Sequence, residues 1–116
     1  MEANVTSDLG WDDFMKVEMR TGTVIGAEVF AEARHPAYKI TIDFGPFGIR
    51  KTSAQVTRRY SPEALIGKQV VAVINFPPKQ IATMMSECLL LGAVDENNDV
   101  VLLQPGINVK NGLRIG

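Results

Sequence analysis

The feature that most constrains the fold is a strict alternation of apolar and polar side chains over residues 38–44. Its apolar members are Tyr38, Ile40, Ile42 and Phe44, and its polar members are Lys39, Thr41 and Asp43. An alternation with a period of two is typical of a strand that buries one face and exposes the other. The chain must therefore build a sheet with a buried face around this strand, which excludes an all-helical fold.

The remaining apolar segments are short and are separated by turns rich in Gly, Pro and Asn, which favours a mainly β fold. Gly22 and Gly26 fall inside the first segment and predict bends or bulges there. Five or six short strands with such turns indicate a barrel or a sandwich. We expect the strands at residues 21–30, 38–44, 49–53, 70–74, 87–94 and 100–103.

Short helices are expected at the N-terminus and between the third and fourth strands. A helix after the third strand of a five-stranded barrel fits the oligonucleotide/oligosaccharide-binding (OB) fold. Polar residues followed by helix-compatible segments predict where these helices begin. The expected caps are Ser7 or Asp8 for a helix over residues 11–16, Ser53 for a segment reaching Tyr60, and Ser61 with Pro62 for a last turn closed by Gly67.

A length of 116 residues predicts a single domain over residues 1–116, because it is close to the commonest domain size. The one cysteine, Cys88, excludes an intrachain disulfide and a Cys-rich zinc site, and its apolar neighbours predict a buried, inert thiol. The N-terminal residues lack the basic start and apolar core of a signal peptide. No apolar run approaches the roughly 20 residues that span a bilayer. We therefore expect a cytoplasmic protein without membrane insertion.

Basic residues are concentrated in the middle of a chain whose formal charge is −1. Residues 44–86 hold six bases and one acid, and a local positive surface is what phosphate attraction requires. The alternative is that these side chains scatter over several faces after folding. Strand parity turns Lys39 outward, and applied to residues 49–53 it turns Ile49 inward and Arg50 and Thr52 outward. The candidates for a phosphate-binding surface are Lys39, Arg50 or Lys51, Arg58, Arg59 and Lys79.

The connection between the strands at 70–74 and 87–94 is longer than an ordinary hairpin turn. Pro77 and Pro78 fix the backbone and remove two amide donors, so they stop the strand and stiffen its exit. Either this segment presents groups for binding, or it is a rigid terminator over a core gap filled by methionines. Phe76 and Tyr60 are the aromatic candidates for stacking on bases.

Catalysis has little support in this sequence. The only histidine, His35, precedes a proline in a loop. The chain contains no Ser-His-Asp set above chance, no glycine-rich phosphate loop and no His/Cys metal spacing. Asp43 and Glu87 are isolated carboxylates. We expect a binding protein rather than an enzyme, with no cofactor and no metal site.

Three segments resemble the tRNA-binding-domain family: AEARHPAYK at 31–39, KTSAQVTRRYSPEALIGKQVVAVINFPPKQIA at 51–82 and SECLLLG at 86–92. The resemblance runs from about Trp11 to Gly116 and is closest to the CsaA export-related chaperones. It implies an OB-fold homodimer that binds tRNA and unfolded or export-bound polypeptide, in association with the secretion machinery and its motor. The residues that it implicates are Arg34, Lys39, Ser53, Gln55, Asn75, Lys79, Ser86 and Glu87.

The chain departs from this family at one position. Many tRNA-binding members have Ser-x-Gly-Met where this chain has SECL at 86–89. A glycine that would let the backbone approach RNA closely is therefore missing at Cys88. The departure favours polypeptide binding, for which Phe76, Met84 and Met85 offer flexible apolar surface. The alternative is a structure-specific tRNA-binding protein without a chaperone role.

More apolar surface is present than a small barrel can bury, which predicts a two-fold homodimer. The N-terminal helix would contribute Trp11 and Phe14. The alternative is that these apolar segments cap the ends of the barrel. The other residues in this group are Ile81, Met84, Met85, Ile107, Val109, Leu113 and Ile115.

Overall fold

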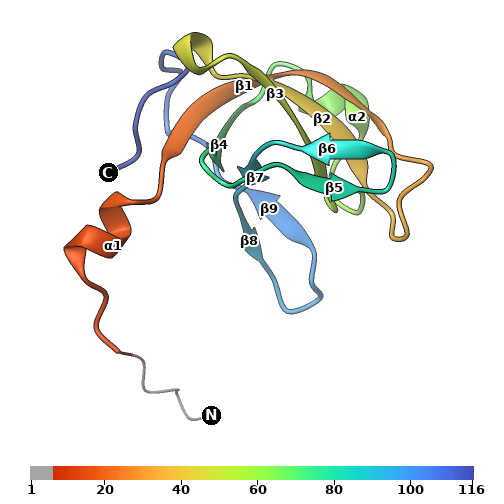
Figure 1. Ribbon diagram of the computed structural model, residues 1–116. Helices are drawn as coiled ribbons and strands as arrows, with labels where there is room; N and C mark the ends of the chain where they lie inside the picture. The colour runs from red at the N-terminus through yellow and green to blue at the C-terminus, as the bar shows by residue number, and fades with distance from the viewer. Residues whose placement is uncertain (1–6) are drawn as a thin grey trace.

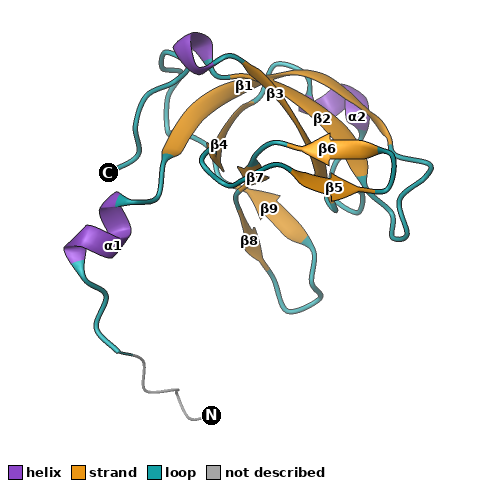
Figure 2. Ribbon diagram, in the orientation of Figure 1, coloured by secondary structure: helices purple, strands orange, loops and turns teal. Residues whose placement is uncertain are grey.

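Residues 7–116 are described by the computed structural model, in which strands form a small barrel (Figures 1 and 2). Five strands make one antiparallel sheet in the order β3-β2-β1-β4-β7, and the pairs β5–β6 and β8–β9 are separate hairpins. The elements are α1 (Trp11–Met15), β1 (Met19–Val29), β2 (Tyr38–Asp43), η1 (Gly45–Phe47), β3 (Ile49–Ala54), α2 (Pro62–Leu65), β4 (Gln69–Val73), β5 (Lys79–Ile81), β6 (Met84–Ser86), β7 (Leu89–Leu90), β8 (Gly92–Val94) and β9 (Val100–Leu102).

The long strand β1 organises the sheet. Its first half pairs with β4 from Met19 to Thr23, and its second half pairs with β2 from Thr23 to Val29. A register shift between Val24 and Gly26 bends the strand, so the bulge predicted at Gly26 is confirmed. The free edge of its first half is covered by the C-terminal segment, where the Thr21 amide donates to the Leu113 carbonyl at 3.0 Å.

The alternating segment is confirmed as the inner wall of the barrel. Ile40, Ile42 and Phe44 are fully buried, and Tyr38 is 7% exposed. They pack in one cluster with buried side chains from other elements. The further members of that cluster are Val24, Val56, Leu65, Val70, Ala72, Ile74, Cys88 and Leu102.

The barrel closes between β3 and the segment that leads into β7. The Glu87 amide donates to the Lys51 carbonyl at 2.8 Å, and the Lys51 amide donates to the Glu87 carboxylate at 3.0 Å. The Thr52 hydroxyl donates to the Cys88 carbonyl at 2.9 Å. A five-stranded antiparallel OB-type barrel, with one helix between its third and fourth strands and another at the N-terminus, is therefore confirmed.

Of the three predicted helix caps, one is correct. Ser61 accepts a hydrogen bond from the Ala64 amide at 3.2 Å and begins α2, and Gly67 ends this segment with a φ of 87°. Ser53 caps nothing, because its backbone is paired opposite Lys39 in the β2–β3 ladder, and residues 57–59 form a turn.

The N-terminal helix has its N-cap at Gly10, without a side-chain cap hydrogen bond. The helix begins at Trp11 as expected, but the prediction of Ser7 or Asp8 as its cap is wrong, because the residue directly before the helix is Gly10. Figure 1 shows α1 standing apart from the barrel, and none of its residues is buried.

The predicted parity of the third strand is also wrong. Thr52 is 2% exposed, whereas Ile49 is 61% exposed. The ladder places Thr52 opposite Ile40 and Arg50 opposite Ile42, so both follow the inner-face residues of β2. The five-residue connection between Asp43 and Ile49 sets this register, and it outweighs the apolar character of Ile49.

The long connection at residues 75–86 contains the β5–β6 hairpin, in which Ala82 turns with a φ of 49°. The single strand predicted over 87–94 is divided into β7 and β8. β8 then leaves the barrel to pair with β9, and Figure 1 shows this hairpin projecting from the body. At Gly92 a side chain would meet Val100 Cγ1 at 2.5 Å, so the hairpin requires glycine there.

Within residues 7–116 no helix has the length and apolar character needed to cross a membrane.

Candidate functional site

A continuous groove runs along the open side of the barrel, between β3, the β5–β6 hairpin and β9. It consists of three hollows that share lining residues. The first hollow lies beside Arg34, the central hollow lies along β3, and the last hollow lies beside Phe76. The first and central hollows share Ser53, Gln55 and Ile81. The central and last hollows share Lys79, Ser86 and Leu89. The central hollow has a volume of about 470 Å³.

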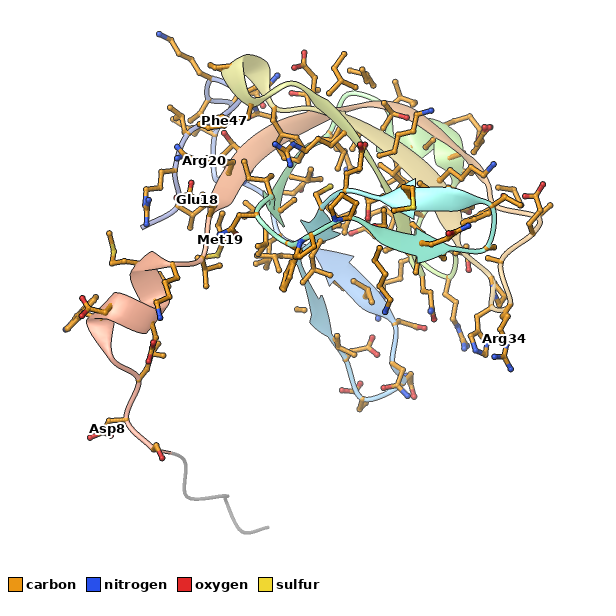
Figure 3. All side chains as sticks on the ribbon, viewed as in Figure 1. Asp8, Glu18, Met19, Arg20, Arg34 and Phe47 are labelled. Carbon is orange, nitrogen blue, oxygen red and sulfur yellow. The ribbon has the colours of Figure 1, made fainter. Side chains whose placement is uncertain are left out.

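The two ends of the groove differ in chemistry. At the first end, Arg34 and His35 from the loop after β1 face Gln80 and Ala82 at the tip of the β5–β6 hairpin. Figure 3 shows Arg34 on this loop, at the opposite side of the barrel from Arg20 and Phe47. At the last end lies Phe76, whose side chain is 54% exposed beside Pro77. A guanidinium at one end and an aromatic ring at the other thus bracket the groove.

The hairpin β5–β6 forms one wall of the groove. Lys79 lies directly opposite Ser86, and Ile81 opposite Met84. Because alternate residues of a strand share a face, Lys79 and Ile81 are both on the groove side. Met84 is half-buried in this hairpin.

Ser86 is held by the buried wall of the groove. Its Oγ lies 3.1 Å from the Thr52 Oγ1 and donates to the Cys88 carbonyl at 3.3 Å. Burial raises the pKa of the Cys88 thiol to about 11. The predicted buried thiol is confirmed, and at neutral pH it is protonated and chemically quiet.

The apolar floor of the central hollow comes from residues that sequence analysis did not select. These are Leu89, Leu90, Val100 and Leu102. No local pattern distinguishes them from ordinary core residues, since they join the groove only when β7 and β9 fold against β3.

The charges that line the groove are of one sign. Arg34 and Lys79 are its charged side chains, with His35 beside them, and no Asp or Glu of residues 7–116 lines any of the three hollows. This asymmetry occurs in a chain with a formal charge of −1. The groove is therefore suited to a ligand that is anionic or neutral.

The predicted basic residues fall into separate groups. Lys39 and Lys51 line a different hollow, on the outer face of the sheet, together with Glu28 and Thr41. The Lys39 Nζ lies 4.0 Å from a carboxylate oxygen of Glu32. The outer face therefore carries a mixed charge, and it is not continuous with the groove through shared lining residues.

The arginines of the predicted set are already engaged. Arg50 points along the inner face and donates to the Ile74 carbonyl at 2.8 Å. Arg58 forms an ion pair with Asp99 at 2.9 Å, and Arg59 forms one with Asp95. Arg58 and Arg59 lie just beyond Gln55 and Val56, which line the central hollow.

Asn75 uses its side chain to hold the N-terminal segment. Its Oδ1 accepts from the Glu18 amide at 3.0 Å, and its Nδ2 donates to the Lys16 carbonyl at 2.7 Å. Glu87 is likewise occupied, by the Lys51 amide.

Tyr60 is not available for stacking. Its ring packs on the core, and its hydroxyl accepts from the Leu102 amide at 3.0 Å. Of the two predicted stacking residues, Phe76 is the exposed one.

A second charged cluster lies away from the groove, at the base of α1 (Figure 3). Glu18 pairs with Arg20 at 2.8 Å and with Arg114 at 3.4 Å, and Arg20 lies 4.3 Å from the centre of the Phe47 ring. The hydrogen bond from Arg20 lowers the pKa of Glu18. This cluster fastens the N-terminal and C-terminal segments to β1, and among residues 7–116 no group of three or more His, Cys, Asp or Glu side chains is placed to hold a metal ion.

A small OB-type barrel with an open cationic and apolar groove defines a ligand-binding module. Residues 19–114 match the family model described as "Putative tRNA binding domain", and the chain belongs to this family. Curated relatives include the methionine--tRNA ligase of Porphyromonas gingivalis, 31% identical over 113 residues, or 97% of this chain and 16% of that protein. Methionine--tRNA ligase 1 of Sorangium cellulosum is 36% identical over 104 residues, which are 90% of this chain and 15% of that protein. The chain thus spans about a sixth of these relatives.

Three solved structures resemble this chain over nearly its whole length. Chaperone CsaA from Bacillus anthracis has a TM-score of 0.90 and 52% identity, covering 95% of this chain and 100% of that one. The CsaA chaperone protein of Picrophilus torridus has a TM-score of 0.88 and 42% identity, covering 94% and 100%. A MetRS related protein from Pyrococcus horikoshii has a TM-score of 0.85 and 28% identity, covering 96% and 100%. The predicted resemblance to CsaA chaperones and tRNA-binding domains is therefore confirmed.

Proposed function

We propose that this protein binds tRNA through the groove between β3, the β5–β6 hairpin and β9, and that its role is binding rather than catalysis. The observation that carries this proposal is the lining of the groove, whose charged side chains, Arg34 and Lys79, are both cationic. Phosphate groups are attracted to such a lining, and membership of the tRNA-binding domain family agrees with it. We place this activity in the cytoplasm, where tRNA is found.

The groove offers each type of contact that a single-stranded segment of RNA needs. Arg34 and Lys79 would bind phosphates, and Ser53 and Gln55, which lie between them, would hydrogen-bond base edges or ribose hydroxyls. Phe76 would stack on a base at the far end. Unpaired loops and ends of tRNA expose such groups, so they are the expected targets.

Unfolded polypeptide is the second candidate ligand. It is favoured by the apolar floor of the central hollow, formed by Leu89, Leu90 and Val100 beside Ile81. The likeness to CsaA chaperones supports the same idea. In this second proposal the bound chains are export-bound polypeptides, and the secretion motor is the partner that receives them.

A fluorescence-anisotropy titration with mixed tRNA, at low and at moderate salt, tests the first proposal. Phosphate contacts predict a log–log salt slope of roughly −0.7 to −0.9 per contact. We expect Arg34→Ala with Lys79→Ala to weaken binding by about tenfold, because two charge-assisted contacts are lost. The control is Lys68→Ala with Lys110→Ala, which removes the same charge from residues that do not line the groove.

An unfolded polypeptide titrated in parallel separates the two candidates. Apolar binding should change little with salt, and Leu89→Ser should weaken it more than Arg34→Ala does. If tRNA fails to bind at both salt concentrations while the polypeptide binds, the RNA proposal is wrong and the chaperone proposal stands.

We also propose that the protein is a homodimer joined through α1. Trp11 is 81% exposed, and Leu9 and Met15 are 70% and 53% exposed on the same arm. Large apolar side chains that stay exposed together on one arm are typical of an interface. A two-fold dimer would present two grooves to one large ligand and so raise its avidity.

A further inference from the structure

Two turns meet beside the central hollow of the groove. The turn at residues 57–59 follows the wall that contains Gln55 and Val56. The turn between β8 and β9 comes just before the opposite wall, which contains Val100 and Leu102. Because the β8–β9 hairpin projects from the barrel (Figure 1), side-chain contacts between these two turns brace it against β3.

Two ion pairs join the turns. Arg58 Nε lies 2.9 Å from Asp99 Oδ1, and Arg59 pairs with Asp95. The two cations are the accessible partners, with side-chain exposures of 74% and 46%, whereas those of Asp99 and Asp95 are 15% and 19%. A ligand that arrives from solvent therefore reaches the arginines before it reaches the acids.

The carboxylate of Asp95 has two separate roles in the acidic turn. Asp95 Oδ1 accepts from the Asn97 amide at 2.8 Å and from the Asp99 amide at 3.0 Å. Its other oxygen, Oδ2, faces Arg59. One oxygen therefore shapes the turn while the other pairs with the arginine, so the two roles can be separated by substitution.

We propose that Arg58 and Arg59 form a phosphate site at the rim of the groove, and that Asp95 and Asp99 occupy it as built-in competitors when no RNA is bound. Guanidinium groups bind carboxylate and phosphate with the same fork geometry. Because the arginines are the exposed members of both pairs, a phosphate backbone can reach them and compete with the carboxylates. This inference rests on the proposed tRNA binding, and it adds regulation by the β8–β9 hairpin.

The test is the tRNA affinity of the variant Asp95→Asn with Asp99→Asn. At residue 95, asparagine keeps an oxygen that can accept the two turn amides. At both positions it removes the charge that pairs with an arginine. The matched control is Glu63→Gln with Glu96→Gln, which changes the net charge equally. Glu96 lies in the same turn, and neither glutamate takes part in the ion pairs found among residues 7–116.

We expect the Asp95/Asp99 variant to bind tRNA about tenfold more tightly than the control at low salt. In the background Arg58→Ala with Arg59→Ala, the same two substitutions should give no gain beyond that of the control, because the site that they release is gone. A gain equal to the control's, or one that persists without the arginines, overturns the inference.

The outcomes also separate this inference from the proposed function. If the wild-type protein binds tRNA and the variant gains nothing, only the inference fails. If the wild-type protein does not bind tRNA and the variant does, the role of Asp95 and Asp99 as competitors of phosphate is confirmed. If neither binds, both proposals fall. Should the double variant melt at a lower temperature, Asp95→Asn alone is used, and the Arg59 Nε–H signal in ¹H–¹⁵N spectra must shift when tRNA is added to the wild-type protein.

Discussion

At the scale of single residues, close packing explains choices that look arbitrary in the sequence. Gly22 lies where β1 crosses the inner wall of the barrel, and a Cβ there would come within 2.6 Å of Ile42 Cγ2 and 2.8 Å of the Phe44 ring. Gly26 is also in β1, but its Cβ would meet Thr41 at 3.4 Å, an ordinary contact. The same residue type therefore serves different needs four positions apart.

Gly22→Ala should destabilise the protein by about 1–3 kcal/mol, because it overpacks a fully buried cluster. Gly26→Ala is the matched control, and it should change the free energy of unfolding by less than about 0.5 kcal/mol. Urea unfolding of both variants measures the difference. Equal effects would show that strand bending, rather than contact with Ile42 and Phe44, selects glycine at Gly22.

Cys88 should resist alkylation in the folded protein. Its pKa of about 11, against an ordinary 9.0, lowers the thiolate fraction at pH 8 by about a hundredfold. Because burial favours the neutral thiol, this group's contribution to stability is present below pH 9 and lost as the pH rises from about 9 through about 11. The measurements are the iodoacetamide rate at pH 8, with and without denaturant, and the unfolding free energy of the wild-type protein and Cys88→Ala at pH 8 and 10. Rapid labelling without denaturant would contradict the burial.

At the scale of elements, a residue that the sequence predicts to bind ligand instead holds two segments of the chain together. Asn75 lies two residues after β4 and binds the backbone of residues 16–18 with both ends of its amide group. It also precedes Phe76, the last residue of the groove. The same clasp thus fixes the direction of the α1 arm and the exit of the strand.

Asn75→Ala should loosen the arm and leave the barrel folded. Loss of two hydrogen bonds, each worth about 1 kcal/mol, predicts roughly thirtyfold faster amide exchange at Glu18. Exchange of the Ile40 and Ile42 amides should not change. The control is Asn97→Ala, an exposed asparagine of the β8–β9 turn. If exchange at Glu18 stays slow, other contacts of the arm, such as that of Glu18 with Arg114, hold it.

At the scale of the whole molecule, the arrangement of charge and apolar surface decides what the barrel can bind. The groove presents cations to one side, while Leu9, Trp11 and Met15 form an apolar arm at the other end. The proposed dimer would cover this arm and leave both grooves open.

Trp11 is the only tryptophan in the chain, so it reports on that dimer directly. Dilution of a dimer should move its fluorescence to longer wavelength, since the ring becomes exposed to water. Trp11→Ala should weaken association in analytical ultracentrifugation, whereas Val29→Ala, also at an exposed apolar residue, should not. A monomer at every concentration, or a dimer unaffected by Trp11→Ala, would contradict an interface at α1.

Much of the fold could be predicted, because it depends on local patterns. The alternation at residues 38–44 identified the inner wall, and Ser61, Pro62 and Gly67 defined α2 correctly. The parity of β3 could not be predicted from its own residues, because its register depends on pairing with β2 across a five-residue connection. The division of residues 87–94 into β7 and β8 likewise depends on the contact of Gly92 with β9.

The candidate site was predicted in part. The sequence determined the residue types available to it, including Arg34, Lys79 and Phe76, and it determined that the acidic and basic residues lie in different segments. Only the tertiary structure decided that Lys39 and Lys51 face away from the groove and that Arg58 and Arg59 are paired with acids. The physical reason is range: hydrophobic periodicity and capping act within a few residues, whereas a groove and its charge depend on contacts between strands distant in the chain.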